Sequence, residues 1–148
     1  MKAFVISAAL VVLVAISVQA DEKKANEKVT EVFNKCRGTW PVTDEEVEQV
    51  KRKEKIPESK NAKCMLACML KEAKVLKDGE YSKDNALLMA DVLHKDEPEQ
   101  AEKLKQVVEL CTVEVGTDTK GDECEYAYKM AVCSCKHAKE LGVKTPEF

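Results

Sequence analysis

The chain has 148 residues, of which 45% are hydrophobic, 24 are Lys or Arg and 27 are Asp or Glu. With only five Gly and four Pro, this apolar content is sufficient for a packed core, which excludes a disordered, collagen-like or repeat protein. The net charge of -3 argues against a nucleic-acid-binding protein, because neutralising phosphates requires a surplus of clustered Lys and Arg. The length is that of one domain.

The first twenty residues have the pattern of a secretory signal peptide. Lys2 supplies a positive start, residues 3–18 are apolar apart from two serines, and Val18-Gln19-Ala20 offers small residues at a cleavage site. A membrane-spanning helix needs about 20 apolar residues, and this run is followed at once by charged residues. We therefore expect a signal peptide over 1–20, one secreted domain over 21–148, and no stable membrane insertion.

Helical periodicity and helix-boundary residues predict about six helices, whereas strand patterns are nearly absent. The capping box Thr43-Asp44-Glu45-Glu46 is the clearest start signal. Seven consecutive apolar residues over 64–70 predict a helix that is enclosed on nearly all sides. The predicted helices are, in chain order, Glu22 to Cys36 with a break at Gly38 and Pro41, Thr43 to before Pro57, Ser59 to Asp78-Gly79, Ser82 to before Pro98, Pro98 to the turn at 116–121, and about Asp122 to Leu141.

Seven cysteines lie in the predicted mature chain, where an oxidising compartment makes disulfides the expected state. Seven choices of the leftover cysteine times 15 pairings of the other six leave 105 frameworks open. Zinc is the rival interpretation, but the chain has one C-x3-C and two histidines, so we expect no metal. The seven are Cys36, Cys64, Cys68, Cys111, Cys124, Cys133 and Cys135.

Helix geometry indicates crosslinks between helices, without selecting a pairing. Cys64 and Cys68 are four residues apart and project from one helix face, so they can join two different neighbours. Cys124 and Cys133 are half a turn out of phase. Cys135 lies on nearly the same face as Cys124, and helical phase alone leaves open whether Cys133 or Cys135 is the odd residue.

The cysteine spacing resembles that of the six-cysteine insect odorant-binding proteins, the family of the pheromone-binding and general odorant-binding proteins. C-x3-C, C-x8-C and Lys55-Ile56-Pro57 ahead of Asn61-Ala62-Lys63-Cys64 carry the resemblance, which covers the whole mature chain. It implies an all-α fold of about six helices around an internal apolar cavity. It also implies three interlocked disulfides, Cys36–Cys68, Cys64–Cys124 and Cys111–Cys133.

Cys135 departs from this family pattern. An extra thiol allows a mixed disulfide framework, a covalent dimer or a buried cysteine that takes part in no bridge. We expect the buried cysteine, because cysteine packs as a small apolar residue.

The resemblance also implies a function. The protein would be a secreted carrier that reversibly binds small hydrophobic molecules, odorants or pheromones, with no cofactor. An olfactory receptor would be a candidate partner, sensillum lymph the location if the role is olfactory, and a monomer or weak homodimer the assembly. Disulfides fit this function, since each offers about 2 to 4 kcal/mol against the several kcal/mol that a ligand cavity of about 300 Å³ could cost.

The candidate lining residues are apolar side chains at helical spacing on elements that must face one another. Few mature aromatic residues are present, so we expect an aliphatic cavity with a tyrosine hydroxyl as its polar contact. Four methionines in the mature chain would adapt to ligands of different shape. The candidates are Met65, Leu66, Met69, Leu70, Leu76, Leu87, Leu88, Val92, Leu104, Val107, Val108, Tyr128, Met130 and Ala131, with Phe148 at the C-terminus as a plug or roof.

His94 is a candidate pH switch. It lies near Asp91, Asp96 and Glu97, so its protonation would alter the link between the fourth and fifth helices. The alternative is a solvated surface histidine with no role in binding.

Two other classes of protein compete with the carrier. An enzyme is not expected, because the sequence lacks G-x-S-x-G, H-E-x-x-H and a Gly-rich phosphate loop, and a pair such as Asp91 and His94 arises by chance on a helix surface. A secreted helical protein that acts by protein–protein interaction would have a filled core and an exposed apolar patch. A non-olfactory lipid or hormone carrier on the same scaffold is a further alternative.

Overall fold

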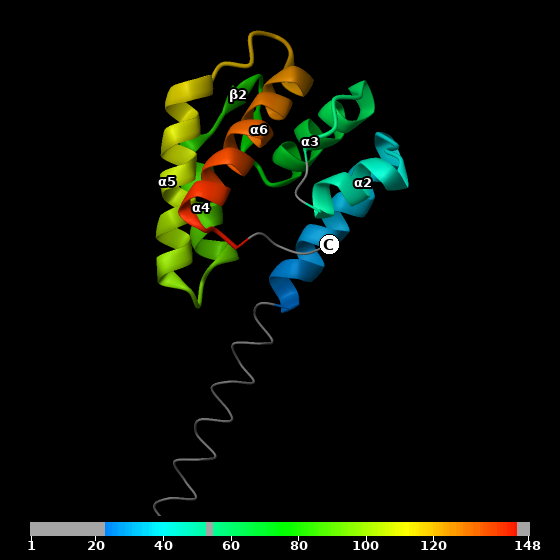
Figure 1. The fold of residues 1–148 in the computed structure, drawn as a ribbon. Helices are drawn as coiled ribbons and strands as arrows, with labels where there is room; N and C mark the ends of the chain where they lie inside the picture. Colours follow the sequence, from blue (N-terminus) through cyan, green and yellow to red (C-terminus); the bar gives the residue numbers. More distant parts are fainter. Residues whose placement is uncertain (1–22, 53–54, 145–148) are drawn as a thin grey trace, which may run out of the picture.

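The computed structural model describes residues 23–52 and 55–144, and over these ranges the chain forms six helices and one small hairpin (Figure 1). The predicted signal peptide and Phe148 lie outside the described residues. A first helix covers residues 23–39. It is followed by α2 (Asp44–Lys51), α3 (Lys60–Glu72), β1 (Leu76–Lys77), β2 (Glu80–Tyr81), α4 (Lys83–Leu93), α5 (Pro98–Val115) and α6 (Glu123–Leu141). The predicted all-α fold class is confirmed.

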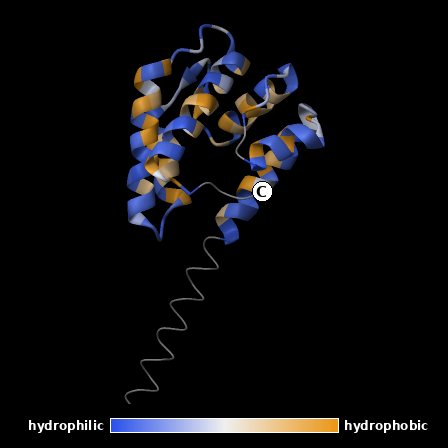
Figure 2. Ribbon diagram, in the orientation of Figure 1, coloured by the Kyte–Doolittle hydropathy of each residue, from blue (hydrophilic) through white to orange (hydrophobic). Residues whose placement is uncertain are grey.

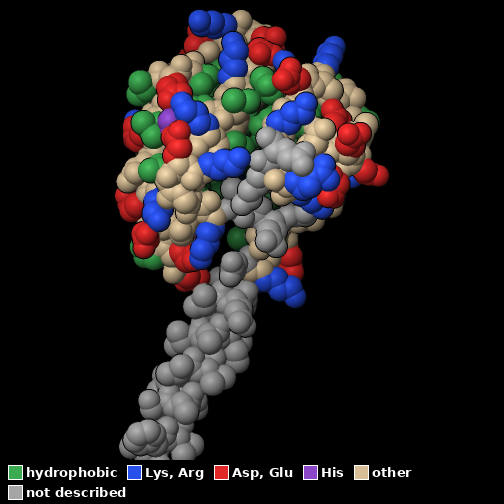
Figure 3. Space-filling view, viewed as in Figure 1, with side chains coloured by type: hydrophobic (Ala, Val, Ile, Leu, Met, Phe, Trp, Pro, Cys, Tyr) green, Lys and Arg blue, Asp and Glu red, His purple; other side chains and the backbone are tan. Residues whose placement is uncertain are grey.

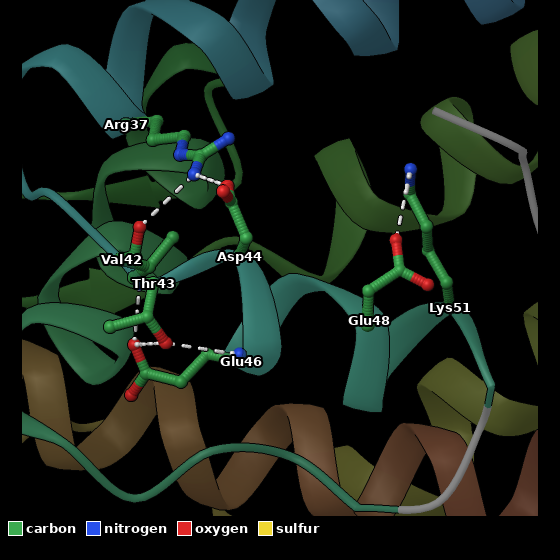
Figure 4. Close-up of polar contacts among 7 residues, drawn as sticks. All are labelled: Arg37, Val42, Thr43, Asp44, Glu46, Glu48 and Lys51. Atoms are coloured by element: carbon green, nitrogen blue, oxygen red, sulfur yellow. Dashed lines mark hydrogen bonds and ion pairs between the residues drawn. The ribbon is translucent and has the colours of Figure 1, made fainter.

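Local side-chain caps begin most of these helices, as the sequence predicts. The Thr43 hydroxyl accepts a hydrogen bond from the Glu46 amide at 3.1 Å, and the Glu46 carboxylate accepts one from the Thr43 amide at 2.9 Å (Figure 4), so the capping box is confirmed. The side chains of Ser59, Ser82 and Asp122 each accept a hydrogen bond from the amide three residues later, and so cap α3, α4 and α6.

A side chain from the first helix contacts the start of α2, and an ion pair within α2 lies at its end (Figure 4). Arg37 of the first helix donates to the Val42 carbonyl at 3.2 Å and pairs with Asp44 in the first turn of α2. Glu48 and Lys51 lie 3.9 Å apart at its end. The start of α2 is therefore joined to the preceding helix by a cation placed beside acidic first-turn residues.

Two predicted helix ends are wrong. The first helix continues to residue 39, because the Trp40 amide still donates to the Cys36 carbonyl at 2.8 Å and Gly38 fits within it. The third helix ends at Glu72, six residues before Asp78. There the Val75 amide bonds to the Leu70 carbonyl and the Lys74 amide to the Lys71 carbonyl, both at 2.9 Å, which is a Schellman motif. Lys74 takes its left-handed position, with φ 58°, so no glycine marks this end.

The Asp78-Gly79 pair makes a hairpin turn where the sequence had indicated a helix end. Both residues have positive φ, 53° and 79°, the backbone that a two-residue type I′ turn requires. Leu76 pairs with Tyr81 across the two antiparallel strands. The near absence of strand patterns did not predict this hairpin, because each strand is only two residues long.

The helices pack as amphipathic elements around two apolar clusters, and hydropathy alternates along them (Figure 2). The first cluster joins α3, the hairpin, α4, α5 and α6 around Leu76, Val107 and Met130. The second joins the first helix, α2 and α3 around Phe33 and Met65. Acidic and basic side chains are interspersed over the face drawn in Figure 3.

Three disulfides join four of the helices that form the two clusters. Cys36–Cys68 joins the first helix to α3, Cys64–Cys124 joins α3 to α6, and Cys111–Cys133 joins α5 to α6. These are the three pairs that the family resemblance implied. Their loops overlap along the chain, so covalent bridges join the first helix, α3, α6 and α5 in series.

Cys135 is exposed, so the expectation of a buried cysteine is wrong. It lies two residues beyond Cys133, which is about 200° around α6. Cys133 faces Cys111 of α5, and this rotation turns Cys135 away from that contact. The contact with α5 therefore identifies Cys133 as the bridged residue.

The apolar run of α3 behaves as predicted, since none of residues 64–70 is exposed. Within the described ranges, no helix has the length and apolar character needed to cross a bilayer.

Candidate functional site: the apolar interior

The first apolar cluster gathers eight of the predicted lining residues from five elements. Their side chains are buried or half-buried and pack together between α3, β1, α4, α5 and α6. Separate stretches of sequence supply them, so only the fold places them in one interior. They are Leu66, Leu70, Leu76, Leu87, Leu104, Val107, Val108 and Met130.

The two α3 methionines point into the second cluster. Met65 is buried there and Met69 packs against it, whereas Leu66 and Leu70 pack in the first cluster. Each pair is four residues apart and shares a helix face, and the two faces are about 100° apart. Helix α3 therefore forms a wall shared by both clusters.

Leu88 and Val92 do not belong to the interior. Their exposed fractions are 63% and 69%, which corrects their prediction as lining residues. They are four residues apart on α4, on the face opposite Ala86 and Ala90, which are buried. Apolar character alone misplaced them, because a helix with apolar residues on several sides has no unique inner face in sequence.

The two buried tyrosines, Tyr81 and Tyr126, pack beside each other, and the Tyr126 hydroxyl is bonded within the fold. The Tyr126 hydroxyl donates to the Gly116 carbonyl at 2.7 Å. Tyr81 packs beside it, with ring centroids 6.1 Å apart, and burial raises the pKa of Tyr81 to about 12. Burial likewise raises the pKa of Tyr126. Both phenols therefore stay neutral, and the Tyr126 hydroxyl is already used by the fold.

Tyr128 and Ala131 of α6 are half-buried, and Tyr128 lies beside a cation. The Lys63 ammonium group is 4.5 Å from the centre of the Tyr128 ring and 2.7 Å from the Glu125 carboxylate. The hydrogen bond to Glu125 raises the pKa of Lys63. This cation–π contact and ion pair join α3 to α6 next to the Cys64–Cys124 disulfide.

His94 is buried, with 8% of its surface exposed, so the alternative of a solvated surface histidine is wrong. It caps the C-terminus of α4, and its amide donates to the Ala90 carbonyl at 3.2 Å. Its Nδ1 lies 3.8 Å from the Glu97 carboxylate. Among the described residues its Nε2 has no hydrogen-bond partner.

The start of the C-terminal tail is attached beside His94. Glu97 forms an ion pair with Lys144, whose hydrogen bond is the main reason that the pKa of Glu97 is lowered. The Lys144 amide also donates to the Gln100 side chain at 2.8 Å, and Val143 is buried in the first cluster. Residues 142–144 are therefore fixed to the link between α4 and α5.

His137 is a second buried histidine, which the sequence analysis did not single out. Its Nε2 lies 2.7 Å from the Glu114 carboxylate of α5, and its Nδ1 lies 2.8 Å from the Glu140 carboxylate. The contact with Glu114 is the largest cause of a raised pKa at His137. In the sequence, the spacing of three residues between His137 and Glu140 on one predicted helix was the available indication of an interaction between them. The contact of His137 with Glu114 depends on tertiary structure.

His137 also gathers with Cys111 and Cys133, and their donor atoms lie within 4.8 Å of one another. Both sulfur atoms are bonded to each other in a disulfide, so neither is the thiolate that a metal requires. The cluster therefore contains residue types that are common in metal sites, but its two cysteines cannot act as ligands while they form the disulfide.

Comparisons with known proteins agree with this architecture. The sequence matches the PBP/GOBP family over residues 18–137. It is 28% identical over 134 residues to general odorant-binding protein 19d of Drosophila melanogaster, covering 90% of this chain and 87% of that protein. Odorant-binding protein dmelOBP28a from Drosophila melanogaster has a similar fold, with a TM-score of 0.63 and 21% identity over 83% of this chain and 99% of that one. For Apis mellifera odorant binding protein 5 the TM-score is 0.66 and the identity 22%, over 80% and 89%. The cysteine pattern, the fold and the family match lead to one conclusion: the chain belongs to the PBP/GOBP family.

Proposed function

We propose that the protein is a carrier that binds small hydrophobic molecules reversibly in the interior lined by the first apolar cluster. The observation that supports this most is the convergence of eight apolar side chains from five elements in a member of the PBP/GOBP family. Binding removes apolar surface from water and involves no covalent step. The ligands we propose are odorants, pheromones or related lipids.

The expected affinity is moderate. Covering about 400 Å² of apolar surface contributes about 10 kcal/mol at about 25 cal/mol per Å². Association costs of about 4 kcal/mol leave about 6 kcal/mol, a dissociation constant of tens of micromolar. We expect broad selectivity, because apolar contacts discriminate weakly among ligands of similar size.

Displacement of a polarity-sensitive fluorophore tests the carrier function. Oxidised protein over residues 21–148 is titrated with the fluorophore and then with a panel of volatile alcohols, esters and fatty acids. Saturable binding to one site with displacement supports the proposal. A flat titration would contradict it and would favour the secreted interaction protein, for which exposed Leu88, Val92, Leu110, Val113 and Val132 supply apolar surface.

A matched pair of variants on α5 tests where the ligand binds. Leu104 packs against the first cluster, whereas Leu110 is 42% exposed on the same helix. Leu104→Trp adds bulk on the interior side, so we expect it to weaken fluorophore binding at least tenfold, and Leu110→Trp to leave binding unchanged. Equal effects of the two variants would contradict an interior site.

We also propose that the carrier acts in extracellular fluid after removal of residues 1–20, as a monomer or weak homodimer. An olfactory role would add sensillum lymph as the location and an olfactory receptor as partner. The mass of the protein secreted from insect cells tests the cleavage site, since a mature chain that begins at Asp21 is expected.

We propose that His94 and the tail attached beside it control ligand exchange. His94 lies near Glu97, and Glu97 is paired with Lys144. Protonation of His94 would place a cation beside a carboxylate that already holds the tail, and would redistribute that ion pair. Phe148 follows four residues later as the proposed plug or roof.

A further inference from the structure

His94 Nε2 has no hydrogen-bond partner within the part of the chain that the structure describes. Among the described residues it is the one buried side-chain nitrogen or oxygen atom in this state. The histidine side chain is 7% exposed. Buried polar atoms are nearly always hydrogen-bonded, and an exception calls for an explanation. The other buried histidine, His137, uses both ring nitrogens, so burial of an imidazole in this fold does not by itself leave a nitrogen unused.

The ring stands at the end of the inner face of α4. Ala86, Ala90 and His94 follow one another at intervals of four residues, so they form a single buried stripe. Ala86 belongs to the first apolar cluster. Eight residues of helix separate Ala86 from His94, about 12 Å at about 1.5 Å per residue. An unused polar atom thus lies on the buried helix face that carries Ala86 of the first cluster, at a distance along α4 of about the length of a medium alkyl chain.

The surroundings of the ring favour one tautomer. Nδ1 faces the Glu97 carboxylate at 3.8 Å, and the hydrogen bond from Lys144 lowers the pKa of Glu97, which keeps it ionised. A carboxylate attracts an N–H and repels a lone pair. In the neutral ring the proton therefore sits on Nδ1, which leaves a lone pair on Nε2. That nitrogen can accept a hydrogen bond and cannot donate one.

We propose that His94 Nε2 accepts a hydrogen bond from the hydroxyl group of an elongated apolar alcohol whose alkyl chain lies in the first cluster. This inference rests on the proposed carrier function and adds the ligand class. An ester, ether or hydrocarbon has no proton to donate, so it leaves Nε2 desolvated and without a partner. An ionised carboxylate also only accepts hydrogen bonds, so it cannot bond to the lone pair of Nε2.

A ligand pair that differs only in the hydroxyl proton tests the inference. 1-Decanol and its methyl ether keep the same chain and the same oxygen. Each is tested for displacement of the fluorophore from the oxidised protein at about pH 8. After correction for the water-to-octanol partition of each compound, we expect decanol to bind roughly tenfold more tightly than the ether.

His94→Phe and His137→Phe are the matched variants. The first removes the acceptor and keeps a ring, so we expect the decanol preference to disappear while ether affinity is retained. The second replaces the imidazole whose nitrogens are already bonded to glutamates, so we expect the preference to remain. A preference that survives in His94→Phe, or is lost equally in both variants, overturns the inference.

A spectroscopic measurement on the unmodified protein covers the case in which His94→Phe does not fold. The ¹⁵N resonance of His94 Nε2 should shift on addition of decanol and stay in place on addition of the ether. Equal binding of decanol and ether by the unmodified protein, or an Nε2 resonance that ignores decanol, overturns the inference and leaves the carrier function standing. Failure of both compounds to displace a bound fluorophore likewise overturns the inference, whereas a flat fluorophore titration would contradict the carrier function itself.

Discussion

The Cys64–Cys124 disulfide should be the most stabilising of the three. It closes a separation of 60 residues, against 32 for Cys36–Cys68 and 22 for Cys111–Cys133. A bridge restricts the unfolded chain more strongly as its loop lengthens, and the loop-entropy relation gives about 4.3, 3.7 and 3.4 kcal/mol in that order. Replacing both Cys64 and Cys124 with Ala should therefore lower the free energy of unfolding by about 4 kcal/mol.

Cys64 is also buried, at 3% exposure, in the apolar run of α3. Its bridge stands beside the ion pairs Lys63–Glu125 and Lys71–Glu123, which join the same two helices. The Lys63–Glu125 pair is half-buried and Lys71 is exposed, and ion pairs that remain in contact with water contribute little, so they cannot replace the covalent link. We expect loss of the bridge to loosen α3 from α6 and to weaken fluorophore binding together with stability.

Urea unfolding, followed by Trp40 fluorescence and by far-ultraviolet circular dichroism, measures the change. Trp40 packs against the second cluster, whereas circular dichroism reports all helices, so agreement of the two signals tests for a single transition. All variants carry Cys135→Ser to prevent thiol exchange, and the matched control is Cys111→Ala with Cys133→Ala. A loss below about 1 kcal/mol for the Cys64 and Cys124 pair, or a clearly larger loss for the control, would refute the loop-entropy reasoning.

Two pH-dependent effects should separate the two histidines. The pKa of His137 is raised above its ordinary 6.5 by Glu114 first and Glu140 next, so its contribution to stability is complete below 6.5 and is lost as pH rises through the folded-state pKa. As pH rises from 6.5 through the folded-state pKa, the melting temperature should therefore fall more in the unmodified protein than in His137→Gln. Identical pH profiles of the two proteins would contradict a stabilising interaction of His137 with Glu114 and Glu140. For His94, we expect His94→Gln to abolish the pH dependence of fluorophore binding; an unchanged dependence would discard the proposed switch.

Features that depend on neighbouring residues in the chain were predictable from the sequence alone. The capping box at Thr43 and the serine caps at Ser59 and Ser82 form within one helical turn, and the structure contains all three. The apolar run over 64–70 is enclosed because seven consecutive apolar residues leave a helix no polar face. Counting the cysteines left the disulfide pairing undetermined. The pairing followed only from the resemblance to a family with the same cysteine spacing.

Tertiary contacts decided the remainder. Cys133 is bridged and Cys135 is exposed because Cys111 on α5 approaches one side of α6. Leu88 is exposed while Leu87 is half-buried because α4 turns only one face toward α5. His94 is buried, with its ring near Glu97 from the link to α5. Exposure and hydrogen-bond partners depend on residues distant in sequence, and helical periodicity reports only how side chains are arranged within their own helix.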